Sequence, residues 1–255
     1  MQPHEKVTAA ILGANGEGRT ALVPFITAGY PEPSAFAGTL RKIAGVADVI
    51  EIGVPFSDPM ADGMTIQRSS LAAIRNGVTL KWIFEELGTA GIDTPLVMMS
   101  YVNPLLAFGF ERLAERAAET GVCAFIVPDL PFEESDALGT SLDARGIGLV
   151  QLVTPATPRP RLEALANASK SFVYAVTITG ITGGDKGLPD NLASYLDSVS
   201  SVSRLPVCAG FGIRTAADVM DVGRHAAGAI VGSALVEVLE RGEDAAEYLR
   251  ALKRR

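Results

Sequence analysis

Eight short apolar runs, rich in β-branched residues, recur along the chain at spacings mostly in the twenties. They start near residues 20, 48, 95, 123, 148, 172, 206 and 228. Continuous apolar runs of this length are typical of parallel strands that are covered on both faces. We therefore expect a sheet of eight parallel strands.

Stretches of helical period separate these runs. Many of them end on glycine, and several start at Ser, Asp or Thr, whose side chains cap free backbone amides. We expect an N-terminal helix over 5–12, a loop at 13–18, and helices over 34–45, 65–77, 80–91, 110–121, 133–146, 160–169, 191–202, 215–226 and 243–252.

Eight strand and helix units predict a closed (β/α)8 barrel, or TIM barrel, with an extra N-terminal helix and a single domain over residues 1–255. Closure leaves no edge strand exposed. The alternative, an open doubly wound sheet, would have a glycine-rich turn after its first strand, where this chain has YPEPS. In closed barrels the chemistry lies on loops after the strands.

Composition excludes several classes of partner. Acidic residues outnumber basic ones by 29 to 22, and no basic stripe with interleaved aromatic residues indicates nucleic-acid binding. No apolar run is long enough to span a membrane, and the N-terminus lacks the pattern of a signal peptide. We expect a cytoplasmic protein whose two cysteines, Cys123 and Cys208, are buried and reduced.

The segment EIGVPFSDPMADG at 51–63 places a carboxylate, Glu51, inside an apolar strand. Strand alternation directs Ile50 and Ile52 toward the helices and Glu51 into the barrel. Burial raises the pKa of a carboxyl group, which suits a general acid and base. The alternative is a structural Glu paired with Arg or Lys, but no predicted strand carries a basic residue among its apolar positions.

Three further acids follow the ends of strands. Asp62 lies in a loop restricted by Pro55 and Pro59, and we take it as the second candidate catalytic residue. Asp58, in the same loop, is interpreted as a turn or cap residue. For Asp129 a structural hydrogen bond and a substrate contact are equally compatible with the sequence.

Glycines after the last three strands predict a phosphate site. Gly212 follows the seventh strand, and Gly232 and Ser233 can begin a short helix after the eighth. Gly183 and Gly184 lie after the sixth strand. Backbone amides at such glycines approach an anion closely, and a helix N-terminus favours it. The alternative is that these glycines only make tight turns.

The residue inventory argues against other chemistries. His4 and His225 do not fall at strand ends, which argues against a metal site or a Ser/His/Asp triad. All six lysines fall in helices or loops, so no Schiff base is expected. A carboxylate pair would still cleave a carbon–carbon bond if the substrate were its own electron sink, as an indole ring protonated at C3 is. The flat apolar pocket for such a ring has five candidate side chains, Phe25, Met99, Tyr101, Tyr174 and Phe211, although each of them considered alone fits the barrel core better.

The chain resembles the tryptophan synthase alpha chain family over nearly its whole length. The matching stretches are PFITAGYP, IEIGVPFSDPMADGMTIQ, SYVNP, VPDLPFEES, GITGGD, CAGFGI and VGSALV. The resemblance implies cleavage of indole-3-glycerol phosphate to indole and glyceraldehyde 3-phosphate. It also implies a partner, a beta chain that carries pyridoxal phosphate, in an α2β2 heterotetramer, with no cofactor on this chain.

The same resemblance assigns roles to residues. It makes Glu51 the acid and base and Asp62 the partner of the indole nitrogen, with Thr182 positioning Asp62. The remaining matches are Tyr174 as the active-site tyrosine, Gly183, Gly212, Gly232 and Ser233 as the phosphate cradle, and Phe25, Met99 and Phe211 as the pocket wall.

Two positions depart from the pattern of relatives. Met64 stands where proline is frequent, and VTITGITG replaces a Ser-Arg version of the sixth strand end. Three alternatives stay open: a lyase that acts alone and releases indole, a phosphosugar isomerase on the same barrel, and a catalytically silent barrel that activates a partner. Intact Glu51 and Asp62 argue against the last.

Overall fold

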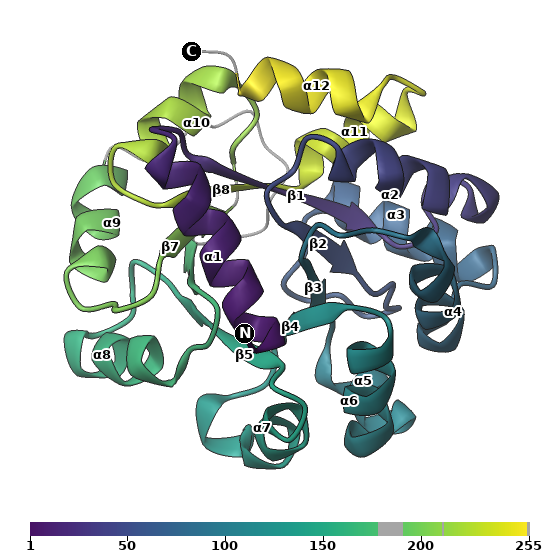
Figure 1. The fold of residues 1–255 in the computed structure, drawn as a ribbon, viewed down its shortest axis with the longest axis horizontal. Coiled ribbons are helices and arrows are strands. Elements are labelled where there is room, and N and C mark those ends of the chain that lie inside the picture. The colour runs from purple at the N-terminus through teal and green to yellow at the C-terminus, as the bar shows by residue number, and fades with distance from the viewer. Residues whose placement is uncertain (178–190, 211, 254–255) are drawn as a thin grey trace.

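Eight parallel strands close into a barrel in sequence order (Figure 1). The computed structural model describes residues 1–177, 191–210 and 212–253. Strand β1 pairs with both β2 and β8, which completes the ring. The strands are β1 (Ala21–Thr27), β2 (Ile50–Gly53), β3 (Leu96–Met99), β4 (Val122–Ile126), β5 (Gly148–Val153), β6 (Val173–Val176), β7 (Val207–Gly210) and β8 (Gly228–Val231). The predicted (β/α)8 barrel is confirmed, and each strand begins within two residues of its expected start.

Helices surround the barrel on its outer face (Figure 1). The described residues form α1 (Pro3–Gly16), α2 (Phe36–Ala44), α3 (Met64–Arg75), α4 (Leu80–Ala90), α5 (Val102–Phe108), α6 (Phe110–Glu119), α7 (Asp136–Asp143), α8 (Arg159–Ala168), α9 (Leu192–Ser200), α10 (Ala216–Gly223), α11 (Ser233–Glu240) and α12 (Ala245–Leu252). Helix α5 was not predicted. It contains Pro104, which is tolerated because it lies in the first turn, where the amide has no helical partner.

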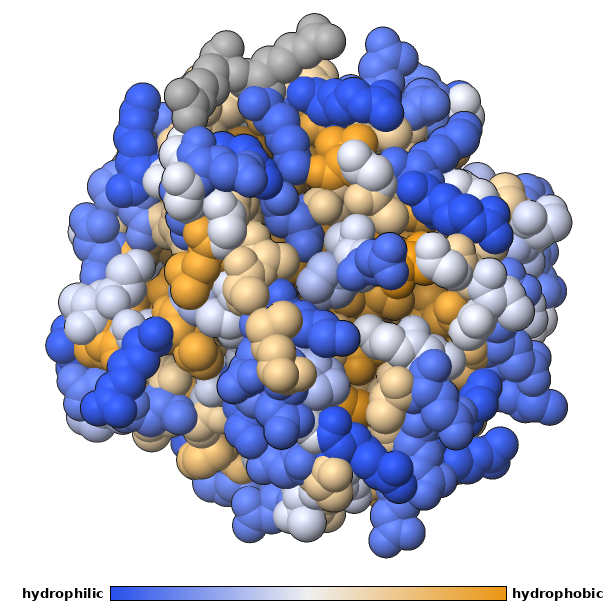
Figure 2. Space-filling view, in the orientation of Figure 1, coloured by the Kyte–Doolittle hydropathy of each residue, from blue (hydrophilic) through white to orange (hydrophobic). Residues whose placement is uncertain are grey.

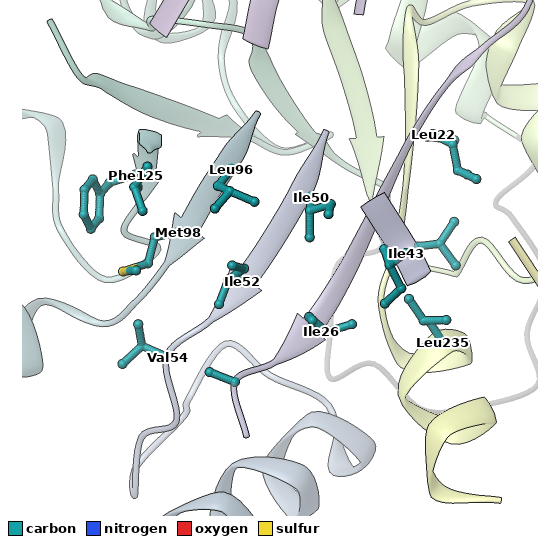
Figure 3. Packing of buried hydrophobic residues seen from close by; sticks show 14 of the residues in the cluster. Leu22, Ile26, Ile43, Ile50, Ile52, Val54, Leu96, Met98, Phe125 and Leu235 are labelled. Atoms are coloured by element: carbon teal, nitrogen blue, oxygen red, sulfur yellow. The ribbon is translucent and has the colours of Figure 1, made fainter. Parts of the chain in front are cut away.

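Strand alternation divides the buried side chains into two clusters. Ile50 and Ile52 of β2 pack with Ile43 of α2 and Leu235 of α11 in the layer between strands and helices (Figure 3). Val49 belongs instead to the cluster inside the barrel. Glu51 shares the parity of Val49, so the predicted inward direction of Glu51 agrees with the packing.

Helix α1 lies across one end of the barrel (Figure 1). Its side chains Val7, Ile11 and Ala14 are fully buried and belong to the interior cluster. The expected loop at 13–18 was partly wrong, because the helix continues to Gly16. The buried Ala14 and the amide of Asn15, which donates to the carbonyl of Ala227 at 2.8 Å, hold this last turn against the barrel.

The outer surface is mainly hydrophilic on the face that Figure 2 presents, and apolar side chains appear there mostly in hollows between polar ones. Cys123 and Cys208 are buried free thiols, as predicted. Among the described residues, no helix is long and apolar enough to cross a membrane.

Candidate active site

Glu51 lies in the middle of the barrel wall, between Phe25 of β1 and Val97 of β3 in the strand register. The residue is 1% exposed. Its Oε2 has no hydrogen-bond partner among the described residues. Burial, and secondarily the negative charge of Asp62, raise the pKa of Glu51 to about 8. The carboxyl group is therefore protonated at neutral pH, and no cation among the described residues forms an ion pair with it.

Asp62 is presented by the loop between β2 and α3. The backbone amide of Asp62 donates to the carbonyl of Pro59 at 3.1 Å, and the side chain of Gln67 donates to the carbonyl of Asp62 at 2.8 Å. The residue is 8% exposed. Burial raises the pKa of its carboxyl group to about 6, against the opposing effect of a hydrogen bond from Tyr101. Asp62 is therefore mostly ionised at neutral pH, where Glu51 is mostly protonated.

Tyr101 connects this loop to β3. Its hydroxyl donates to Oδ2 of Asp62 at 3.1 Å and accepts from the amide of Ala61 at 3.0 Å. Its ring stacks on Phe56, with centroids 5.1 Å apart. The sequence predicted Tyr101 as a pocket residue only. No sequence signal indicated the hydrogen bond to Asp62, because the two residues are distant in the chain and become neighbours only when the barrel forms.

Asp129 and Asp58 have structural contacts. Oδ1 of Asp129 accepts from the amide of Val102 at 2.9 Å, which satisfies a free amide at the start of α5. The carbonyl of Asp58 accepts from the amide of Met60 in a turn, and its carboxylate accepts from Ser57. For Asp58 this agrees with the turn interpretation, and for Asp129 the observed bond is the structural one of the two alternatives.

Three predicted pocket residues belong to the cluster inside the barrel: Phe25, Met99 and Tyr174. Two strand-end glycines make room for the rings. A Cβ atom at Gly53 would lie 2.4 Å from Cζ of Phe25, and one at Gly210 would lie 2.2 Å from the hydroxyl oxygen of Tyr174. Burial, followed by the charge of Glu51, raises the pKa of the Tyr174 hydroxyl, which keeps it protonated.

Other residues around Asp62 were not predicted. A small cavity beside it is lined by Phe25, Met99 and Tyr101 together with Val54, Ile66, Ser70 and Ser100. The residues from α3 are recognisable in the sequence only as the buried face of a helix, because helical periodicity does not separate residues that line a site from residues that fill the core.

Three of the predicted phosphate residues, Gly212, Gly232 and Ser233, lie after the ends of two neighbouring strands, since β7 pairs with β8. Gly212 has φ of +79°, a conformation that favours glycine. Gly232 precedes α11 and Ser233 is its first residue, where helix amides are free of helical partners. Thr182, Gly183, Gly184 and Phe211 lie outside the described residues.

Metal ligands are not grouped in the described part of the chain, where no three His, Cys, Asp or Glu side chains could share an ion. His225 contacts Asp197 at 2.8 Å, and His4 lies in α1. The site therefore consists of a protonated carboxyl group, an ionised one and an apolar wall.

A closed barrel of parallel strands with two buried acidic side chains, one in a strand and one in the loop after it, is an arrangement typical of enzymes that work by general acid and base catalysis. Comparisons with known proteins make this specific. The family model described as tryptophan synthase alpha chain matches residues 12–254. The tryptophan synthase alpha chain of Roseiflexus sp. (strain RS-1) is 43% identical over 239 residues, with 92% of each chain covered. That of Bacillus cereus (strain AH820) is 41% identical over 251 residues, covering 96% of this chain and 97% of the relative.

A solved structure agrees with these relatives. The Mycobacterium tuberculosis tryptophan synthase has a chain that superposes with a TM-score of 0.87 at 33% identity, covering 97% of this chain and 95% of that one. The chain described here belongs to the tryptophan synthase alpha chain family. It is a lyase of tryptophan biosynthesis that cleaves indole-3-glycerol phosphate to indole and glyceraldehyde 3-phosphate.

Proposed function

We propose that Glu51 and Asp62 carry out this cleavage. The neutral Glu51 donates its proton to C3 of the indole ring, which turns the ring into an acceptor of electrons. Asp62 accepts a hydrogen bond from the ring N–H and stabilises the positive charge that develops there. The Glu51 carboxylate then takes the proton of the side-chain hydroxyl next to the ring. The carbon–carbon bond breaks, its electrons return to the ring, and an aldehyde and indole leave.

The observation that carries this proposal is the burial of the two acids in different surroundings, with Oε2 of Glu51 lacking a partner among the described residues and Asp62 accepting a hydrogen bond from Tyr101. Burial raises the pKa of Glu51 to about 8, whereas the Tyr101 hydrogen bond opposes burial at Asp62 and its pKa is about 6. A proton donor and an anion therefore coexist near pH 7. Each acid has the charge that its step requires before substrate arrives.

The rest of the site would hold the substrate at its two ends. The apolar wall would pack against the flat ring, and free amides at the ends of β7 and β8 would bind the phosphate. We assign the ring to Phe25, Met99, Tyr174 and Phe211, the phosphate to Gly183, Gly212, Gly232 and Ser233, and the positioning of Asp62 to Thr182 and Tyr101. Asp129 would act indirectly, through α5.

We further propose that the chain acts in the cytoplasm as one domain of an α2β2 complex. The relatives are alpha chains, and the matched solved structure is described as tryptophan synthase, which supports a beta-chain partner. Pyridoxal phosphate would reside on that partner and act on the released indole. A lyase that acts alone would use the same residues, so only a binding measurement separates the two cases.

The test is to supply indole-3-glycerol phosphate and measure indole, with and without a beta chain. Glu51→Gln should lower turnover by about 10² to 10⁴-fold and leave binding of glyceraldehyde 3-phosphate unchanged. Asp62→Asn should lower turnover more than ground-state binding, because the charge it stabilises exists mainly in the transition state. Glu85→Gln, at an exposed carboxylate of α4, is the matched control. Wild-type turnover in Glu51→Gln would refute the assignment.

The pH profile provides a second test. The rate should rise as Asp62 ionises, around pH 6, and fall as Glu51 loses its proton, around pH 8. Glu51→Asp would retain a carboxyl group but move it away from the indole ring. It should therefore keep the shape of the pH–rate profile at a lower rate. A rate that stays flat from pH 5 to pH 9 would contradict the proposed division of roles.

A further inference from the structure

The outer face of β5 is incompletely covered by its helices. Two adjoining cavities, of about 120 and 180 Å³, lie there between α7 and α8, the helices that flank β5 in Figure 1. Both cavities are lined by Phe132, Leu149 and Gln151. Leu149 is only half-buried, although it lies within a barrel strand. We call this pair of cavities the β5 groove.

The β5 groove is separate from the active site. Along β5, Val150 belongs to the cluster inside the barrel, whereas Leu149 and Val153 belong to the cluster between strands and helices. Gln151 has the parity of Leu149 and Val153, so its side chain lies on the helix side of the strand. A molecule in the groove would therefore be on the other side of the barrel wall from Glu51.

Gln151 is the polar group at the floor of the groove. It is 8% exposed, and its side-chain amide makes no hydrogen bond with the residues that the structure describes. Only its backbone amide has a partner, Oγ of Ser169 at 2.9 Å. A side-chain amide offers two donors and an acceptor, and those of Gln151 face the groove and are not enclosed, so they are available to a molecule bound there.

The two cations at the rim of the groove are already paired with carboxylates, and a third carboxylate, Asp136, also lines it. Arg161 forms a two-pronged ion pair with Glu133, and its guanidinium lies 5.9 Å from the centroid of the Phe132 ring. Lys170 forms an ion pair with Asp143 at 2.5 Å. An anionic ligand would have to compete with Glu133 and Asp143 for these cations and would face Asp136, whereas an uncharged ligand would not.

We propose that the β5 groove binds a small uncharged molecule that pairs a carboxamide, or an equivalent edge with one donor and one acceptor, with the amide of Gln151. Its apolar body packs against Phe132 and Leu149. The volume suits a single ring and its substituent rather than a folded partner. The side-chain amide of Gln151 thereby gains hydrogen bonds that the described residues do not provide.

Benzamide is the probe for this site, and benzoate is its charged counterpart of the same shape. The measurement is a titration of the intact chain followed by the side-chain amide resonance of Gln151 in nitrogen–proton NMR spectra. We expect a saturable shift with benzamide and at least tenfold weaker binding of benzoate. Equal binding of the two compounds, or a resonance that reports exchange with an ordered water only, would overturn the proposal.

Variants separate recognition from folding. Gln151→Met keeps the length of the side chain and removes the amide, so benzamide affinity should fall at least tenfold, while stability and cleavage of indole-3-glycerol phosphate stay unchanged. Phe132→Ala removes the apolar wall from a partly exposed position and leaves Gln151 in place, so it should also weaken benzamide at least tenfold. Unchanged affinity in either variant would refute the assignment, and a clear loss of stability in Gln151→Met would mean that the amide has a partner within the chain.

Discussion

The buried carboxyl group of Glu51 should make the stability of this protein depend on pH. In the folded state burial raises its pKa from 4.5 to about 8. A raised pKa means that the folded state binds the proton more tightly than the unfolded chain does. The resulting stabilisation is complete below pH 4.5 and is lost as pH rises through about 8. Replacing Glu51 by Gln removes this titration.

The magnitude follows from the two pKa values. The pKa of Asp62 is also raised by folding, from 3.8 to about 6. The stabilisation that protonated Asp62 contributes is therefore lost by about pH 6. Between pH 6 and pH 8 the change in stability is therefore due mainly to Glu51. Each pH unit in that interval corresponds to about 1.4 kcal/mol, so the wild-type free energy of unfolding should fall by up to about 3 kcal/mol. For a neutral side chain at position 51, this fall should be absent.

The assay is urea unfolding of wild-type protein and Glu51→Gln at pH 6, 7 and 8. The free energies of unfolding should diverge with pH, and the variant should become the more stable protein at pH 8. Glu85→Gln serves as the control, because its side chain is 55% exposed and its loss should leave the pH dependence unchanged. Parallel pH dependences of wild type and Glu51→Gln would refute the claim that the folded state keeps this carboxyl group protonated.

Three further predictions concern the surroundings of the two acids. Tyr101→Phe removes a hydrogen bond that favours ionised Asp62, so the rising limb of the pH–rate profile should move to higher pH. An unchanged limb would mean that Tyr101 does not control the ionisation of Asp62. Asp129→Ala leaves an amide at the start of α5 without its partner and should lower the free energy of urea unfolding by about 1 to 2 kcal/mol. A smaller loss would mean that water replaces the carboxylate. Gly53→Ala should lower the free energy of unfolding by about 1 to 3 kcal/mol, because the new Cβ would overlap the Phe25 ring. Phe25→Leu in the same chain should recover part of that loss. Two independent, additive losses would contradict the contact.

The strands and the direction of Glu51 could be predicted because they depend on local order in the chain. The apolar runs are short and continuous, and alternation along DVIEIGVPF already separates Ile50 and Ile52 from Glu51. Helix α5 could not be predicted in the same way. Its proline and its short length resemble a loop, and a carboxylate from the end of a later strand, Asp129, accepts from its first amide, that of Val102.

The sequence alone determined the barrel, the two acids and the glycines at the strand ends, because each depends on residue type and spacing along a few turns or strands. Tertiary structure decided the protonation states. Burial acts on both carboxyl groups, but only Asp62 receives the hydroxyl of Tyr101, 39 positions further along the chain. The exposure of the Gln151 side chain to a groove is also a tertiary property, since it results from two helices that leave the middle of β5 uncovered. Desolvation and hydrogen bonding between distant segments arise only when the barrel closes, so they cannot be predicted from local sequence patterns.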